Sequence, residues 1–265
     1  MSEIVTPDPW REWRAATTAR LALGRAGAGM PTDETLRFGW AHAMARDAVH
    51  AAFDADALAA ALRAAGWTVT SAQSRAADRD TYLRRPDLGR QLDADDAARL
   101  RAEAAARPGG GGCDICFVVG DGLSALATER HALPLLAALR PRLPAGWRIA
   151  PLVLARQARV ALADDIGEAF GAALAVMLIG ERPGLSSPDS LGAYLTHAPR
   201  RGRHDGERNC VSNIRPQGLA YGAAAFKLAW LMREALQCGL TGVALKDESD
   251  RDVLEAGLGQ AMLGA

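Results

Sequence analysis

The residue types best suited to binding a polar ligand are concentrated between Gly180 and Leu219. In this stretch the apolar pattern of the preceding segment stops, and charged, hydroxyl-bearing, Pro and Gly residues follow one another. A long polar connection inside a compact chain is more often a binding surface than a slack linker. Its many hydrogen-bond donors and few acids favour a large ligand that carries amides, phosphate or hydroxyls. The polar side chains are Glu181, Arg182, Ser186, Ser187, Asp189, Ser190, Arg208, Asn209, Cys210, Ser212, Asn213 and Arg215.

A second candidate is the turn GDGLSA, which follows an apolar run. Gly120, Gly122 and Ala125 form a loose version of the dinucleotide-binding pattern. Glycines at such a turn let a phosphate approach the backbone, and the N-terminus of the next helix favours negative charge. The turn is therefore consistent either with a nucleotide site or with tight packing between a strand and a helix.

Two features bear on the nucleotide interpretation. Asp121 places a carboxylate inside the turn, and the next apolar segment lacks the terminal acid that would hold a ribose diol. Arg156 and Arg159 follow that segment and could instead take a 2′-phosphate. An NADP-dependent oxidoreductase that uses this turn is therefore an alternative function.

No complete catalytic constellation is visible in the chain. The G-x-S-x-G, HExxH and Walker A patterns are absent, and His197 and His204 have no nucleophile paired with them by sequence. Cys113 and Cys116 belong to a strand-like run, without a second cysteine or histidine pair to complete a metal site, which favours buried thiols. We therefore expect no catalytic residues and no metal ligands in this chain.

The N-terminal part that leads to these residues, 1–107, is predicted to be mainly helical with one short strand. The pattern of residues 10–22 is helix-like, and an Ala-rich helix follows from Thr32 or Asp33. Its predicted apolar face consists of Leu36, Trp40, Ala43, Met44 and Ala48. A helix from Asp54 to Gly66, a strand near 67–73 and a helix that ends at 107 come next. The charged segment Arg75–Arg90 is either a solvated surface or an anchor for a partner.

The C-terminal part, 108–265, begins with a glycine-rich linker, PGGGG, and then changes character. Three apolar runs, at 113–120, 147–155 and 172–180, are separated by helical patterns, and the second helix is expected to begin near Arg156. Continuous apolar strands between helices indicate a parallel sheet covered on both faces. The predicted fold class is α/β, with a doubly wound, mainly parallel Rossmann-like sheet preceded by a helical N-terminal region. An amphipathic helix at 219–237 and a final strand or loop, TGVALKDES, complete the chain.

The composition excludes several classes of function. The 31 basic residues balance 31 acidic residues, so no overall positive field is present to attract nucleic acid or an anionic membrane. No apolar run reaches the roughly 20 residues needed to cross a bilayer, and the first residues do not resemble a signal peptide. We expect a cytoplasmic protein that binds neither nucleic acid nor membrane.

Four blocks in collinear order carry a resemblance to a known family: SRAADRDTYLRRPDLGRQL, VVGDGLSA, IGERPGLSSPDSLGAYLT and ERNCVSNIRPQGLAY. Together they resemble the small subunit of the adenosylcobalamin-dependent ethanolamine ammonia-lyase. The resemblance covers nearly the whole chain from about Arg20 onward, and the blocks GERPGLSSPDSLG and RNCVSNIR are the most specific.

The resemblance implies a partner, a TIM-barrel large subunit that carries the substrate site and most of the chemistry. In the resulting hetero-oligomer the small subunit helps to bind adenosylcobalamin, and the complex converts ethanolamine to acetaldehyde and ammonia by radical chemistry. The family's cobalamin-contacting positions match Val160, Glu181 and Cys210. Members of the family can be packaged in a bacterial microcompartment, and the short segment before the shared region leaves packaging open. A purely structural assembly subunit is the remaining alternative function.

Overall fold

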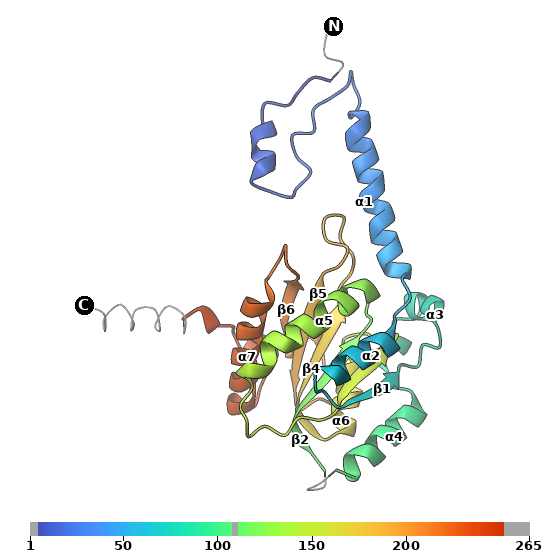
Figure 1. The fold of residues 1–265 in the computed structure, drawn as a ribbon, viewed down its shortest axis with the longest axis vertical. Coiled ribbons are helices and arrows are strands. Elements are labelled where there is room, and N and C mark those ends of the chain that lie inside the picture. Colours follow the sequence, from blue (N-terminus) through green and yellow to red (C-terminus); the bar gives the residue numbers. More distant parts are fainter. Residues whose placement is uncertain (1–4, 108–110, 252–265) are drawn as a thin grey trace, which may run out of the picture.

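Apolar and β-branched runs form the strands of one six-stranded sheet in the computed structural model, which describes residues 5–107 and 111–251. The order in the sheet is β1-β3-β2-β4-β5-β6 (Figure 1). The strands are β1 Val69–Gln73, β2 Cys113–Gly120, β3 Leu152–Arg156, β4 Ala172–Gly180, β5 Leu191–His197 and β6 Asn209–Ile214. The three apolar runs predicted as strands are therefore β2, β3 and β4.

The sheet is mixed. Strands β1, β3, β2 and β4 pair in parallel, whereas β5 pairs antiparallel with both β4 and β6. The prediction of an α/β fold is confirmed, but a Rossmann-like description covers only the parallel part. The two antiparallel strands lie inside the stretch Gly180–Leu219, which the sequence presented as one long polar connection.

Helices cover both faces of the sheet, as continuous apolar strands require. One face is covered by α2 (Ala55–Ala64), α5 (Ala125–Leu139) and α7 (Tyr221–Cys238). The other face is covered by α4 (Ala94–Ala105) and α6 (Leu162–Ala169). Side chains that alternate along the strands divide into two apolar clusters, one on each face.

Local capping sets where several of these helices begin and end. Asp54 accepts a hydrogen bond from the Ala57 N–H at the start of α2, and Asp93 accepts bonds from two amides at the start of α4. Helix α7 ends at Gly239, whose φ of 68° is the left-handed conformation typical of a C-terminal glycine. Helix α6 begins at Leu162, later than predicted, so Val160 lies in the loop before it.

The N-terminal region departs most from the prediction. The helix expected at 10–22 is only a 3₁₀ turn, η1 (Arg11–Ala15). Helix α1 (Thr32–His50) is present, but only the end of its predicted apolar face is buried: Ala48 is 3% exposed, whereas Leu36 is 68% and Trp40 70% exposed. The helix projects from the sheet-containing body (Figure 1).

The remaining elements are short. They are α3 (Arg79–Arg84), η2 (Leu88–Arg90), η3 (Arg140–Arg142), η4 (Asp205–Glu207) and η5 (Gly242–Ala244), the last in place of the predicted final strand or loop. Strand β1 joins the same sheet as the later strands, and the first three residues of the predicted PGGGG linker, 108–110, lie outside the described residues. None of the described helices combines the length and the apolar character that crossing a bilayer would require.

Candidate functional site

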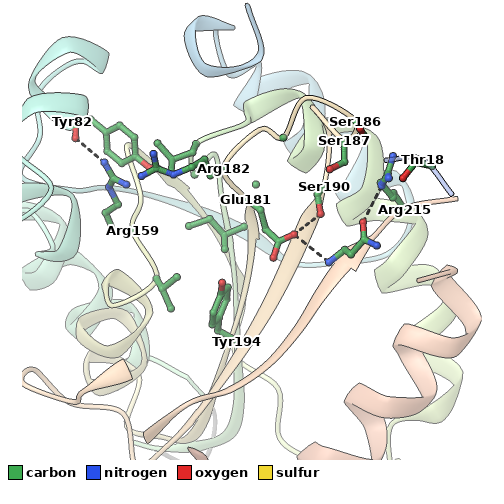
Figure 2. A pocket seen from close by; sticks show the side chains of 17 residues that line it. Thr18, Tyr82, Arg159, Glu181, Arg182, Ser186, Ser187, Ser190, Tyr194 and Arg215 are labelled. Carbon is green, nitrogen blue, oxygen red and sulfur yellow. Dashed lines mark hydrogen bonds between the residues drawn. The ribbon is translucent and has the colours of Figure 1, made fainter. Parts of the chain in front are cut away.

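A hollow of about 690 Å³ lies at the edge of the sheet where the parallel strands β2, β3 and β4 end. In open α/β sheets, ligands bind beyond these carboxyl ends. The returning strands β5 and β6 contribute the opposite wall (Figure 2). The lining residues are Thr18, Tyr82, Gly122, Leu123, Arg159, Val160, Ile179, Gly180, Glu181, Arg182, Gly184, Ser186, Ser187, Ser190, Tyr194, Asn213 and Arg215.

Glu181 follows directly after β4, and its side chain is held by a residue next to β5 and a residue of β6. Its Oε2 accepts a hydrogen bond from the Ser190 hydroxyl and another, 3.1 Å long, from the backbone N–H of Asn213. Asn213 is fixed in turn, because its side-chain oxygen accepts a 3.0 Å hydrogen bond from Nε of Arg215. One carboxylate oxygen thus serves to orient Glu181, and Ser190 and Asn213 line the hollow together with Glu181.

Asp121, in the GDG turn, organises the opposite side of the hollow. Its carboxylate accepts hydrogen bonds from the backbone N–H groups of Gly122 (2.9 Å), Gln157 (2.9 Å) and Ala158 (2.8 Å). Burial raises the pKa of Asp121, and these donors and Arg79, 3.7 Å away, oppose that rise. The carboxylate therefore fastens the loop after β3, which holds Val160, to the turn after β2.

A stack of side chains supports the same loop. The Arg79 and Arg159 guanidinium carbons lie 4.7 Å and 4.2 Å from the centroid of the Tyr82 ring, within the range of cation–π attraction. The Tyr82 hydroxyl donates a 3.1 Å bond to the carbonyl of Ala158, and burial raises the pKa of Tyr82 to about 12. The buried Nε of Arg159 has no hydrogen-bond partner among the described residues.

These contacts divide the charged segment Arg75–Arg90 into two parts. Arg79 points inward, donating to the carbonyls of Val49 and Gly122, whereas Arg84 and Arg85 are exposed and pair with nearby acids. The exposed arginines agree with a solvated surface, and the alternative of an anchor for a partner stays a prediction for them. The solvated interpretation is wrong for Arg79, which is part of the structure around the hollow.

The GDGLSA turn is used for packing. A side chain at Gly122 would overlap the carbonyl oxygen of Gly180, so the glycine permits close contact between the turn and the end of β4. The Gly122 N–H donates to Asp121 and the Leu123 N–H to Gly180, and Arg156 pairs with Asp56 at 3.2 Å. These amides are not available to a pyrophosphate, which removes the support for the NADP-dependent alternative.

The structure brings two of the three predicted cofactor-contacting residues together. Val160 and Glu181 both line the hollow. Cys210 does not, but it lies opposite Tyr194 in the β5–β6 ladder, and Tyr194 is a lining residue. The Cys210 side chain is exposed. Burial raises the pKa of the Tyr194 phenol, so the phenol stays protonated and can donate a hydrogen bond.

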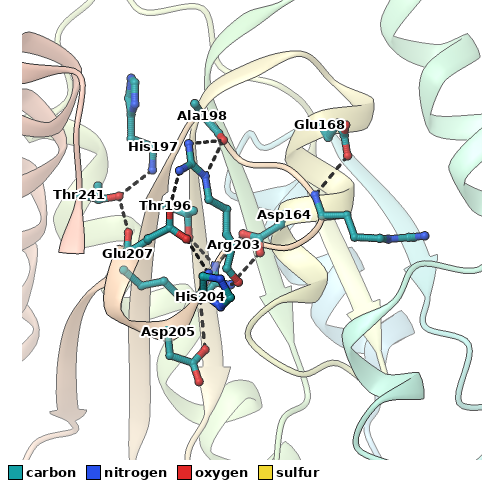
Figure 3. Close-up of polar contacts among 12 residues, drawn as sticks. Asp164, Glu168, Thr196, His197, Ala198, Arg203, His204, Asp205, Glu207 and Thr241 are labelled. Atoms are coloured by element: carbon teal, nitrogen blue, oxygen red, sulfur yellow. Dashed lines mark hydrogen bonds and ion pairs between the residues drawn. The ribbon is translucent and has the colours of Figure 1, made fainter. Parts of the chain in front are cut away.

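Arg208 was predicted to offer its guanidinium to a ligand, and this was wrong. It forms a two-pronged ion pair with Asp164 at 2.6 and 2.7 Å, and both side chains are 2% exposed. Its partners Asp164, Thr196 and Arg203 lie close together in Figure 3. Burial alone would lower the pKa of Arg208, but the hydrogen bonds and charge of Asp164 raise it above its usual value. The two terminal nitrogens of Arg208 also donate to the Thr196 hydroxyl and the carbonyl of Arg203, so the group joins α6 to β5.

His131 forms a further buried polar contact near the hollow. Its Nδ1 lies 2.8 Å from the Tyr221 hydroxyl, and its Nε2 lies 3.6 Å from Asp189. Asp189 also accepts a 2.9 Å bond from Arg130 and precedes the lining residue Ser190. The contact therefore fixes the end of the loop between β4 and β5.

Acid should weaken the fold through His131, because burial lowers its pKa in spite of the Asp189 charge. Below about pH 6.5 the unfolded chain takes up a proton that the folded chain resists, so the free energy of unfolding decreases. The decrease per histidine is at most about 1.4 kcal/mol for each pH unit. Urea unfolding at pH 7.5 and 5.5 should show a smaller difference for His131→Gln than for the unsubstituted chain. Equal differences would contradict this role. His197, whose pKa burial also lowers, contributes in the same direction.

Sequence reasoning missed several residues that shape the hollow: Thr18, Tyr82, Asp121 as a support, Tyr194 and the orientation of Arg159. Tyr82 and Tyr194 lie within the blocks that carried the family resemblance, but no local pattern connects them to a site. Thr18 comes from the N-terminal region, more than a hundred residues away from most of the lining.

These features define an α/β protein with a polar hollow beyond its parallel strands. The sequence pattern of the family described as ethanolamine ammonia-lyase light chain matches residues 7–246. The chain belongs to this family.

Individual relatives agree. The chain is 56% identical over 263 residues to the ethanolamine ammonia-lyase small subunit of Azotobacter vinelandii, covering 98% of this chain and 97% of that one. It is 57% identical over 254 residues to the small subunit from Ralstonia nicotianae, covering 96% and 93%. It is also 54% identical over 250 residues to the small subunit from Pseudomonas syringae pv. tomato, covering 94% and 86%.

Proposed function

We propose that this chain forms one side of an adenosylcobalamin site, which a large TIM-barrel subunit closes. The hollow at the carboxyl edge of the sheet is the observation that carries the proposal. The complete complex would convert ethanolamine to acetaldehyde and ammonia, with substrate and most reacting groups held by the large subunit. The bound cofactor would supply the organic radical that starts such a reaction.

The chemistry of the hollow fits a corrin. A corrin presents a wide apolar face and a rim of amide side chains, which both donate and accept hydrogen bonds. The hollow offers apolar contact through Val160, Leu123 and Ile179, and it offers an acceptor in Glu181. Hydroxyls and guanidinium groups around its rim supply donors, and the buried Nε of Arg159 has no partner within the chain as described.

The residues of this chain would bind, orient and exclude water. Val160 would pack against an apolar edge of the macrocycle, and Glu181 would accept hydrogen bonds from its amides. Cys210, exposed beside Tyr194, would allow close approach at the rim because its side chain is small. None of these roles requires a proton transfer by this chain.

Co-expression with the cognate large subunit tests the proposal. The purified pair should retain cobalamin, measured by cobalt analysis, and release ammonia from ethanolamine only when adenosylcobalamin is present. Assembly without cobalamin binding would favour the purely structural alternative and contradict the proposed site.

Substitution of Glu181 tests the site itself. Glu181→Ala should raise the cobalamin Kd of the complex about tenfold or more, because a hydrogen bond to a charged group contributes about 1.5–3 kcal/mol. Glu181→Gln, which keeps an acceptor, should have an intermediate effect. Titration with hydroxocobalamin, followed by absorbance, measures the affinity, and Glu103→Ala on α4 serves as the control. An unchanged Kd would remove Glu181 from the site.

A further inference from the structure

Large apolar side chains that are exposed to solvent are concentrated in the N-terminal region. Among the described residues, all such side chains except Val243 lie between positions 5 and 40. We call the surface formed by Trp10, Trp13, Leu36, Phe38 and Trp40 the aromatic arm. Its five side chains are between 41% and 70% exposed. Trp10 with Trp13, and Leu36 with Trp40 at helical spacing, form two pairs of neighbouring exposed apolar side chains, and exposed apolar surface that is contiguous marks an interaction site.

The aromatic arm has a defined shape within the chain. Trp10 and Trp13 belong to the segment around η1, and their ring centroids are 6.4 Å apart. Arg14 joins this segment to α1 through a 2.8 Å ion pair with Glu34, which is 7% exposed. The segment around η1 is therefore held against α1, and the rings of Trp10 and Trp13 are exposed to solvent.

The exposed area is large enough for a stable interface. An aromatic side chain buries about 150–250 Å² when fully covered, so the exposed fractions of the four aromatics amount to roughly 350–550 Å². One side of a standard interface buries about 800 Å², of which about 57% is apolar. A partner that contacts both sides of α1 and the segment around η1 would therefore bury enough apolar area for such an interface.

The aromatic arm is connected to the rim of the hollow. Thr18 follows η1 and lines the hollow. Arg20 donates a 3.0 Å hydrogen bond to the carbonyl of Leu185, in the loop between β4 and β5, and its side chain also reaches Ser186 at 3.5 Å. A partner that closes the open side of the hollow therefore meets the segment that carries Trp10 and Trp13.

We propose that the aromatic arm is a docking surface for the large subunit. The inference rests on the proposed function, in which the large subunit closes the hollow, and on the family's small-subunit name, which implies a larger partner. A second copy of this chain is the competing occupant. The large subunit is favoured because the arm is continuous with the rim that the proposed cofactor site leaves open.

The test uses Leu36→Ser/Trp40→Ser, a pair on the solvent-facing side of α1, and Trp10→Ser/Trp13→Ser on the segment around η1. Val243→Ser, at an 87% exposed position outside the arm, is the matched control. Binding to the immobilised cognate large subunit is measured by interferometry, and thermal unfolding checks the fold of each variant. Each arm variant should weaken association at least tenfold, because interface aromatics contribute more than their neighbours, and the control should not.

Two outcomes would overturn the inference. In the first, folded arm variants bind the large subunit as tightly as the unsubstituted chain. In the second, light scattering shows that the lone chain forms dimers which the variants abolish while binding to the large subunit persists. Cobalamin retention by the unsubstituted pair is measured separately. Loss of association in the variants, together with no cobalamin in the unsubstituted pair, would support the docking surface and contradict the proposed function.

Discussion

Replacement of Arg208 by alanine should lower the free energy of unfolding by about 3–5 kcal/mol, the range found when one partner of a buried ion pair is removed. Asp164 would be left as an uncompensated charge at a 2% exposed position. The Thr196 hydroxyl and the Arg203 carbonyl would lose a donor as well. Chemical denaturation of the lone chain, or thermal unfolding of the complex, measures the loss.

Two further variants make this expectation specific. Arg200→Ala removes an exposed arginine from the same connection and should change stability by less than about 0.5 kcal/mol. Asp164→Leu/Arg208→Met removes both charges and should recover a large part of the loss, because apolar residues can replace a buried ion pair. A single Arg208→Ala variant as stable as Arg200→Ala would show that the pair does not hold α6 to β5.

Asp121→Asn should destabilise the chain by about 2–3 kcal/mol and also weaken cobalamin binding by the complex. One amide oxygen can still accept from Gly122 and Ala158, but the amide nitrogen would face the N–H of Gln157 and the Arg79 guanidinium. A buried donor without an acceptor costs about 1–3 kcal/mol, and lost bonds to a charged group add to this. The loop that carries Val160 would therefore loosen.

The affinity measurement distinguishes support of the site from simple destabilisation. Asp121→Asn should raise the hydroxocobalamin Kd of the assembled complex by about tenfold at a temperature where the complex remains folded. Asp80→Asn, at an exposed position on α3, should change neither stability nor affinity. Lower stability with an unchanged Kd would mean that Asp121 supports the fold without positioning Val160.

The central fold could be predicted from the sequence because its strands are buried on both faces. Strands β2, β3 and β4 are almost wholly apolar, and capping residues such as Asp54 and Asp93 mark helix starts. Strand β6 could not be recognised, since only two of its residues are buried and the rest are polar or exposed. The apolar pattern of α1 was read correctly as a helix, but a pattern cannot say whether a face is covered within the same chain.

The residues of the site were harder to predict from the sequence than the strands and helices of the fold. Val160 came from a family resemblance alone, because no local chemistry singles out a valine in a loop, whereas Glu181 was also indicated by the polar stretch that follows the third apolar run. Arg208 looked like a ligand donor because its partner, Asp164, lies 44 residues earlier in the chain. In the sequence, the Asp121 carboxylate looked like an obstacle to phosphate binding. Its structural role could not be predicted, because the Gln157 and Ala158 amides that donate to it are brought near only by the fold.

The chain returns through β5 directly after β4, so the contacts on the two sides of the hollow cost different amounts of chain entropy to form. Ser190 contacts Glu181 from nine residues away, within one hairpin connection, so little chain entropy is lost in closing that loop. The opposite side depends on Asp121 reaching Gln157, 36 residues later, after a helix and a strand have been ordered. Local opening of the connection after β3 would therefore displace Val160 while Ser190 stayed in contact with Glu181. The position of Val160 is only as stable as the packing of α5 and β3.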